Sequence, residues 1–250
     1  MNFDERQYAD FAYYYDYLMS DIDYNAWGGY IDKIIKKYGV LYTDVLEIAC
    51  GTGNIAICMA KKGYDITAFD LSEDMLSIAS NKIIDSEVEV KLLYQDMRDI
   101  KINDDFGIIL CLCDSINYIT DENELKSIFI WVFNHLKPGG LFIFDINSAY
   151  KLEKIIGNNT FTYNKDELAY IWDNYISDEG TVEFYLTFFT KEGSLFRRFD
   201  EFHVEKIYET LDISGYLENI GFEKIDVYDG FTFDKPDEES ERINFVIKKN

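Results

Sequence analysis

An apolar segment followed by a glycine turn is the first feature that could bind a ligand. The stretch 45–49 is apolar and runs directly into Gly51 and Gly53, and helical character begins at Asn54. Glycine carries no side chain, so a ligand can approach the backbone closely there. With Ala56 the spacing also fits the dinucleotide-binding fingerprint. A tight turn without a ligand is a further alternative, because short glycine patterns give false positives.

Two carboxylates stand at the ends of the next expected strands. Asp70 follows Gly51 by nineteen residues, a position from which an acid can take both hydroxyls of a ribose. Asp96 ends the following strand and can accept a hydrogen bond from the amine of an adenine. Met97 can cover the face of the adenine ring. Each acid alone is commonly a solvated strand end or a cap. Both together beside a glycine turn favour a nucleoside-binding site, because ligands of open α/β sheets bind at such strand ends.

Polar residues also follow the fourth expected strand, 106–113. Asp114, Asn117 and Tyr118 interrupt the apolar pattern at an edge where substrates normally lie. We therefore expect them to face an acceptor. The ordinary pKa of tyrosine, near 10, makes Tyr118 a poor base at neutral pH, so an orienting hydrogen bond is its expected role.

A histidine in the second half of the chain is a candidate proton acceptor. Glu201 and His203 are two residues apart on an expected strand and so face the same side. The titration range of histidine suits a general base without any shift. A structural role is the alternative, because a single histidine on a strand usually packs. His135, the other histidine, ends an amphipathic helix, and we expect it to cap that helix.

Aromatic residues near the N-terminus could cover a ligand. Apolar spacing predicts helices at 8–22 and 27–38, and this N-terminal region carries Tyr15, Tyr24 and Trp27. A tyrosine hydroxyl from this region could reach a ligand carboxylate. Plain helix packing is an equal alternative for each residue, because amphipathic stripes usually mean core.

Strands and helices then alternate, which predicts a parallel sheet with helices on both faces. The expected strands are 45–49, 65–69, 88–94, 106–113 and 141–146, and the expected helices between them are 54–62, 72–81 and 125–136. Ser72 is an expected N-cap, and Pro138-Gly139-Gly140 is expected to close the last of these helices. A helix at 213–220 and strands at 223–228 and 243–248 complete this part.

The pattern changes after residue 147. Long strands are expected at 168–176, 181–190 and 195–208, with turn clusters at 178–180 and 191–194. We therefore predict an inserted antiparallel subdomain at 150–208, which forms a lid over the substrate. The remaining segments, 1–149 and 209–250, form the main domain.

Composition excludes several classes of partner. The chain has 24 Lys and Arg against 47 Asp and Glu, a formal charge of −23. Such a field repels phosphate backbones and anionic membranes, so neither is an expected partner. No signal peptide or membrane-spanning run is apparent, and the four cysteines lie in apolar segments without metal-ligand spacing. A cytoplasmic protein without a metal is expected, and its oligomeric state stays open.

Taken together, the segments LEIACGTGN, AFDLSEDML, LYQDMRDI and LKPGGLFIFDIN resemble the class I S-adenosylmethionine-dependent methyltransferases. The resemblance implies a Rossmann-like α/β sheet of seven strands with the last one antiparallel. It implies S-adenosyl-L-methionine as cofactor and these binding residues: Tyr15, Tyr24, Trp27, Ala49, Gly51, Gly53, Asn54, Asp70, Leu71, Met75, Asp96, Met97, Cys113 and Asp114. Ala49 departs from the family, many members of which carry a third glycine there.

Within this class the chain is similar to small-molecule N-methyltransferases, especially deoxysugar N,N-dimethyltransferases. This similarity is carried by Tyr15-Asp16, Asp23-Tyr24, the segments 95–98 and 111–118, and Glu201-Phe202-His203. It implies methyl transfer to nitrogen or oxygen of a small molecule, with Tyr118, His203 and Tyr15 on the acceptor side. Those sugar enzymes tend to have histidine where this chain has Tyr118. An NAD-dependent oxidoreductase, a non-catalytic cofactor-binding module and a protein methyltransferase are the alternatives.

Overall fold

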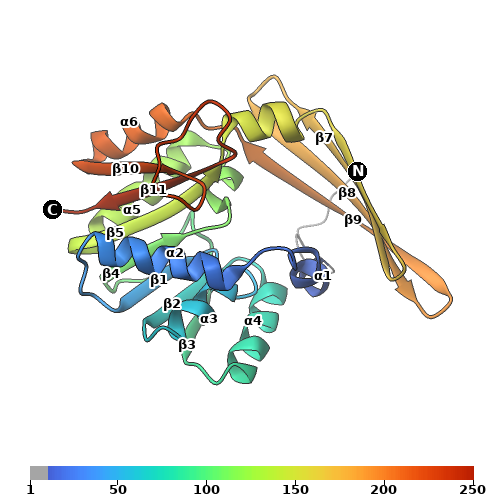
Figure 1. The fold of residues 1–250 in the computed structure, drawn as a ribbon, viewed down its shortest axis with the longest axis horizontal. Coiled ribbons are helices and arrows are strands. Elements are labelled where there is room, and N and C mark those ends of the chain that lie inside the picture. The colour runs from blue at the N-terminus through green and yellow to red at the C-terminus, as the bar shows by residue number, and fades with distance from the viewer. Residues whose placement is uncertain (1–10) are drawn as a thin grey trace.

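A computed structural model describes residues 11–250; the expected helical residue Tyr8 lies outside this range. A seven-stranded sheet forms the main body (Figure 1). In spatial order its strands are β10 (Lys224–Asp229), β11 (Arg242–Lys248), β5 (Leu136–Asn147), β4 (Phe106–Cys111), β1 (Asp44–Ile48), β2 (Asp65–Asp70) and β3 (Val90–Tyr94). β11 runs in the direction opposite to the other six strands and pairs antiparallel with β5 and β10. The expected sheet with an antiparallel last strand is confirmed.

Helices cover both faces of this sheet and build two separate cores. On one face α5 (Glu122–His135) and α6 (Thr210–Ile220) pack against the sheet, and on the other α2 (Tyr24–Lys37) and α3 (Asn54–Ala60) do so. All six residues of β4 are buried, as expected for a central parallel strand covered on both sides. α4 (Glu73–Asp85) begins at the expected N-cap Ser72, whose hydroxyl accepts from the Met75 N–H at 3.2 Å.

The junction of α5 and β5 differs from the sequence expectation. The helix ends at His135, and Pro138-Gly139-Gly140 lies inside β5 instead of closing the helix. The register shifts between Phe106 and Ile108, so the residues after Leu136 bulge out of the ladder. A Cβ on Gly140 would lie 2.6 Å from the carbonyl oxygen of Gly107, so the backbone comes too close there for a side chain. The glycine therefore permits a bulge, which helix-stop rules read as a helix end.

The insertion is an antiparallel meander of four strands, one more than expected. It consists of β6 (Thr160–Lys165), β7 (Leu168–Ile176), β8 (Thr181–Glu192) and β9 (Leu195–Lys206), preceded by the short π-helical segment η2 (Lys151–Ile156). β6 was missed because it is a short edge strand that ends in Asn164-Lys165, a polar edge of the kind that opposes further pairing. Figure 1 shows the long β7–β9 hairpins extending away from the main body.

The short helix α1 (Phe11–Leu18) lies between the main body and the inserted sheet (Figure 1). Phe11, Tyr14 and Leu18 pack against a buried cluster of the inserted sheet that contains Phe188 and Phe199. α1 also contacts α4 of the main body. None of the helices between residues 11 and 250 has the length and apolar character that crossing a bilayer requires.

Candidate functional site

The glycine turn between β1 and α3 presents an open backbone surface. Gly51 and Gly53 have φ of +54° and +75°, in the left-handed region. A Cβ on Gly51 would meet no atom within 4 Å, whereas one on Gly53 would lie 3.2 Å from the Cβ of Ala79 in α4. Gly51 therefore leaves room for a ligand, and Gly53 is needed for packing. Ala49 also has positive φ, +55°, which costs a residue with a Cβ about 1–2 kcal/mol, so glycine would be less strained at this position.

Asp70 ties this turn to the end of β2. Its Oδ2 accepts from the Gly51 N–H at 2.8 Å, and its Oδ1 accepts from the Ser72 N–H at 2.9 Å. Burial raises the pKa of Asp70, and these backbone hydrogen bonds oppose that rise. Each carboxylate oxygen can accept more than one hydrogen bond, so the group keeps capacity for ribose hydroxyls. Leu71 beside it is half-exposed, and Met75 is buried in the first turn of α4.

Asp96 lies at the neighbouring strand end and is held by Arg98. Burial alone would raise the pKa of Asp96, but hydrogen bonds from the Arg98 side chain and backbone outweigh it and lower the pKa. The shortest contact, Arg98 Nη2 to Asp96 Oδ2, is 2.6 Å. The carboxylate is therefore ionised and fixed, as an adenine-binding acceptor must be. Met97 packs against the main core beside it.

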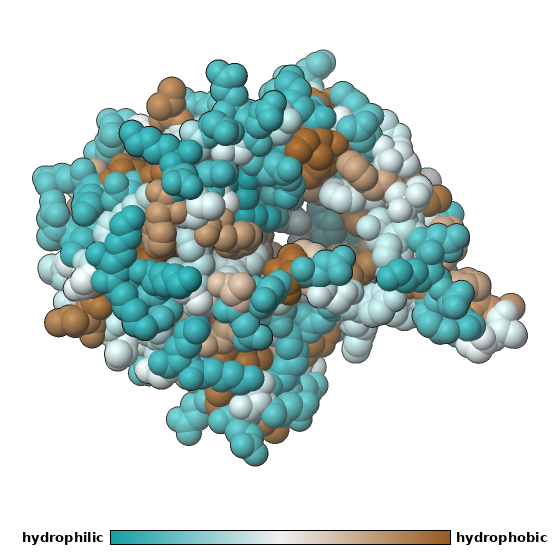
Figure 2. Space-filling view, viewed as in Figure 1, coloured by the Kyte–Doolittle hydropathy of each residue, from teal (hydrophilic) through white to brown (hydrophobic). Residues whose placement is uncertain are grey.

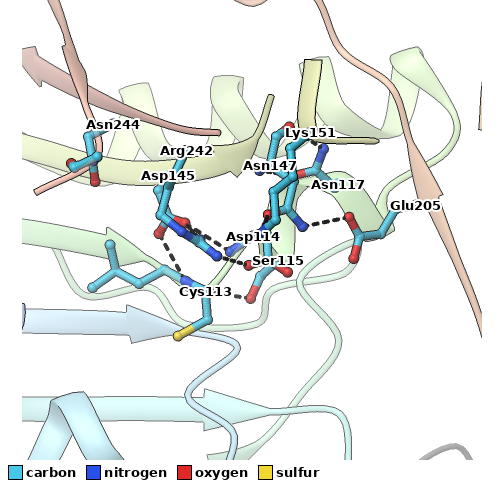
Figure 3. Close-up of polar contacts among 12 residues, drawn as sticks. Cys113, Asp114, Ser115, Asn117, Asp145, Asn147, Lys151, Glu205, Arg242 and Asn244 are labelled. Atoms are coloured by element: carbon cyan, nitrogen blue, oxygen red, sulfur yellow. Dashed lines mark hydrogen bonds and ion pairs between the residues drawn. The ribbon is translucent and has the colours of Figure 1, made fainter. Parts of the chain in front are cut away.

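A buried carboxylate organises the loop after β4 (Figure 3). Asp145 in β5 is fully buried and accepts from the Cys113 and Asp114 N–H groups at 2.9 and 3.1 Å. Cys113 and Asp114 both have positive φ, 59° and 54°, a strained pair that persists only when its surroundings hold it. Arg242 contacts Asp145 and forms an ion pair with Asp114 at 2.7 Å. Asp145 and Arg242 were not among the residues expected at the site; an acid within the otherwise apolar strand 141–146 was the available signal for Asp145.

Buried polar atoms beside this loop lack partners among residues 11–250. They are the indole N–H of Trp27 and Oε2 of Glu47. The Arg242 guanidinium lies 5.4 Å from the centre of the Trp27 ring. Burial raises the pKa of Glu47 to about 8, with a smaller contribution from the charge of Asp70. Buried polar groups are normally satisfied, so the unused indole N–H and the unused carboxyl oxygen near an open glycine turn fit a polar ligand such as the amino acid end of the cofactor.

The remaining cofactor-side residues lie near the same turn. Tyr15 contacts the Phe11 ring at 5.7 Å between centroids, and its hydroxyl side lies toward Tyr24. The side chain of Asn54 is bound to Asp16 and Lys82, so a ligand would meet the backbone of Asn54.

On the acceptor side, the structure brings Tyr118 and His203 together. Tyr118 ends η1 (Ser115–Tyr118), directly after β4, and its ring centre lies 5.9 Å from that of His203 in β9. The ring of Phe11 lies 6.0 Å from His203 on another side. Burial lowers the pKa of His203 to about 4, so the imidazole is neutral at pH 7 and a weaker base than its ordinary titration range suggests.

The inner face of β9 carries a polar cluster that contains the expected pair Glu201 and His203 and also Glu205, which was not expected. Glu201, His203 and Glu205 are all buried on this face, as the alternation predicts. Glu205 accepts from Asn147 Nδ2 at 2.9 Å, and Lys151 donates to Asn147 Oδ1 at 2.8 Å (Figure 3). Burial raises the pKa of Glu205 to about 8.

Asn117 joins strand ends instead of facing an acceptor. Its amide donates to the carbonyl oxygens of Asn147 and Lys206 and accepts from the Asn147 N–H at 3.0 Å. Within residues 11–250 no cluster of three or more potential metal ligands occurs. At the end of α5, His135 bonds to the Trp131 carbonyl oxygen at 2.9 Å, in line with the expected cap.

Comparisons with known proteins agree with this geometry. Residues 45–140 match the model of a methyltransferase domain. The chain is 37% identical over 245 residues to a protein of Geobacillus sp. (strain WCH70) that is named a methyltransferase, a match covering 97% of this chain and 99% of that protein. It is 40% identical to a crystal structure of an S-adenosylmethionine-dependent methyltransferase from Clostridium acetobutylicum ATCC 824, with a TM-score of 0.89 over 97% and 98% of the two chains.

The name of a more distant relative states its substrate. A dTDP-3-amino-3,4,6-trideoxy-alpha-D-glucopyranose N,N-dimethyltransferase of Streptomyces venezuelae is 30% identical over 138 residues, 54% of this chain and 56% of that protein. The matches overturn the alternatives of an NAD-dependent oxidoreductase and a non-catalytic binding module. The chain belongs to the S-adenosylmethionine-dependent methyltransferases.

Proposed function

We propose that this enzyme methylates a nitrogen or oxygen atom of a small molecule held between the C-terminal edge of the main sheet and the inner face of the inserted sheet. The observation that carries the proposal is the contact between Tyr118, at a strand end of the main sheet, and His203 of the insertion. Figure 2 shows a hollow between the main body and the inserted strands. In this proposal residues 150–208 form the acceptor subdomain, and 1–149 with 209–250 form the cofactor domain.

The protein's task in this reaction is alignment. The bound cofactor supplies a methyl group on a sulfonium, which is an excellent leaving group. The strained Cys113–Asp114 loop and the glycine turn hold it in place, and Tyr118 orients the acceptor by a hydrogen bond. Alignment of two reactants contributes roughly 7–11 kcal/mol of barrier lowering. His203 is neutral and can accept a proton only transiently, so it acts chiefly as an orienting group.

The distant relative is named an amino-sugar N,N-dimethyltransferase, and this name supports nitrogen over oxygen as the accepting atom. The charge of −23 supports a small molecule over a nucleic acid. Four cysteines without disulfides support a reducing compartment, so we place the reaction in the cytoplasm.

Incubation of a bacterial metabolite extract with the enzyme and cofactor carrying a deuterated methyl group tests the proposal. Mass spectrometry should find the label on small molecules, and Tyr118→Phe should reduce its incorporation. The absence of label from every small molecule of the extract, together with label on protein or nucleic acid when a whole-cell lysate replaces the extract, would contradict the proposal.

A further inference from the structure

The helix α1 contacts the main body on one side and the inserted sheet on the other, so it links the cofactor side of the proposed active site to the acceptor side. It is only eight residues long, and Ala12 is its single buried residue. A helix this short is not stable on its own in water. Its position therefore depends on the contacts that it makes with the main body and with the inserted sheet.

Toward the main body, α1 is held by one carboxylate. Asp16 Oδ1 accepts from Thr52 Oγ1 at 2.7 Å and from Asn54 Nδ2 at 2.9 Å, and Oδ2 accepts from Lys82 Nζ at 2.6 Å. Lys82, from α4, also donates to Asn54 Oδ1 at 2.6 Å and contacts Thr52 Oγ1 at 3.2 Å. Thr52 lies between the two glycines of the cofactor turn. The network thus joins α1, the glycine turn and α4.

Asp16 is charged when it makes these contacts. Burial alone would raise its pKa, but hydrogen bonds from Lys82, Asn54 and Thr52 outweigh burial and lower it. The ion pair is partly exposed, with 26% of the Lys82 side chain and 37% of the Asp16 side chain accessible. Such a pair contributes modestly to stability, yet it can decide the position of a helix with few other anchors.

Toward the acceptor side, α1 packs on the inner face of the inserted sheet. The ring of Phe11 lies 5.4 Å from Phe188 and 6.0 Å from His203, and Tyr14 stacks on Phe199 at 5.9 Å. His203 in turn contacts Tyr118. A continuous set of contacts therefore runs from the glycine turn through Asp16 and α1 to the residues that we place around the acceptor.

We infer that Asp16 and Lys82 are positioning residues that transmit cofactor binding to the acceptor pocket through α1. A cofactor seated on the glycine turn fixes Thr52 and Asn54, which fixes Asp16 and the helix that carries Phe11 against His203. Coupling of this kind is reciprocal, so α1 also retards release of the cofactor. The acceptor pocket is consequently complete only after the cofactor has bound, and binding is ordered with the cofactor first.

Hydrogen exchange with S-adenosylhomocysteine as the probe tests this inference without any knowledge of the acceptor. In the wild-type chain, saturating probe should slow exchange in residues 11–18 and in the part of β9 around His203, besides the glycine turn. Protection confined to the glycine turn, with α1 and β9 unchanged, would overturn the inference.

Substitutions of Asp16 and Lys82 test whether these two residues carry the coupling between the glycine turn and the segments α1 and β9. Asp16→Asn and Lys82→Gln should abolish the probe-dependent protection of α1 and β9 while the glycine turn is still protected, and should weaken probe binding by about two- to tenfold through faster dissociation. Asp16→Glu should restore part of both effects. Asp99→Asn, which removes an exposed partner of Lys101, is the matched control and should change neither.

Calorimetric affinity and exchange together make each outcome decisive. If Asp16→Asn lowers the melting temperature but keeps the probe-dependent protection of β9, the pair is merely structural and the inference fails. If Asp16→Asn does not fold, Lys82→Gln decides by the same criterion, because it removes the ion pair that joins α1 to α4 and to Asn54 without changing α1 itself.

Discussion

Replacement of Asp70 by alanine should damage cofactor binding and the glycine turn together. The carboxylate accepts from two backbone N–H groups, of Gly51 at 2.8 Å and of Ser72 at 2.9 Å. Hydrogen bonds to a charged group contribute about 1.5–3 kcal/mol each, so loss of its contact with the ribose should weaken binding by at least that amount. Leaving the two N–H groups without their partner should also lower the free energy of unfolding by about 1–3 kcal/mol.

Asp70→Asn separates these two effects. Its amide oxygen can still accept one of the two backbone hydrogen bonds, so part of the stability should return while binding stays weak. Calorimetric titration with S-adenosylhomocysteine gives the affinity, and urea unfolding gives the stability. Asp65→Ala, at the exposed start of the same strand, is the control. Undiminished affinity in Asp70→Ala would refute the assignment of this residue to the ribose.

Three further predictions concern the acceptor side and its supports. Tyr118→Phe and His203→Ala should each reduce turnover of an identified acceptor by about tenfold or more while leaving calorimetric affinity for the cofactor product unchanged; full turnover in both would mean that their side chains are not used. The pKa of Glu205 rises from 4.5 to about 8 on folding, so the folded state binds more protons between these values and stability should fall as pH rises through this window, by up to about 1.4 kcal/mol per pH unit. Glu205→Gln should flatten this part of a stability–pH curve, and an unchanged curve would contradict the buried, protonated carboxyl. Arg242→Met should lower the free energy of unfolding by about 3–5 kcal/mol in urea, because it leaves the buried charge of Asp145 without its partner, and a loss below 1 kcal/mol would show that the pair contributes little.

The main sheet could be predicted from the sequence because its signals are local. A buried strand, a glycine turn and an amphipathic helix each fit within a dozen residues, and their repetition fixes a parallel sheet. The bulge at Pro138-Gly139-Gly140 could not be predicted, because the close approach of Gly140 to Gly107 joins residues far apart in the chain. The edge strand Thr160–Lys165 was missed because its second half is polar.

The candidate site divides in the same way. Asp70 and the glycine turn lie beside a recognisable local pattern, and the sequence placed both at strand ends. Asp145, Arg242 and Glu205 are polar residues within strands, and nothing nearby in the sequence shows what satisfies them. Their partners are remote: Asp145 and Arg242 are 97 residues apart, and Asn147 and Glu205 are 58 apart. Burial on a strand can be read from alternation, but the pairing of two buried charges cannot.

The direction of the last strand has a chemical consequence at the site. β11 is the one strand of the main sheet that runs against its neighbours, so its first residue, Arg242, lies beside Asn147, the last residue of β5. A parallel strand in that place would bring its final residue to this edge and its first residue to the opposite edge. Because β11 is reversed, its first residue lies at the edge of the sheet where β4 and β5 end. A cation there offsets two carboxylates, Asp114 and Asp145, which hold a loop in a strained left-handed conformation. Without that cation the two like charges would repel each other in a buried setting, and the backbone donors of the loop would lose their fixed direction. The antiparallel strand therefore supplies a residue of the candidate site and is not only an addition to the edge of the sheet.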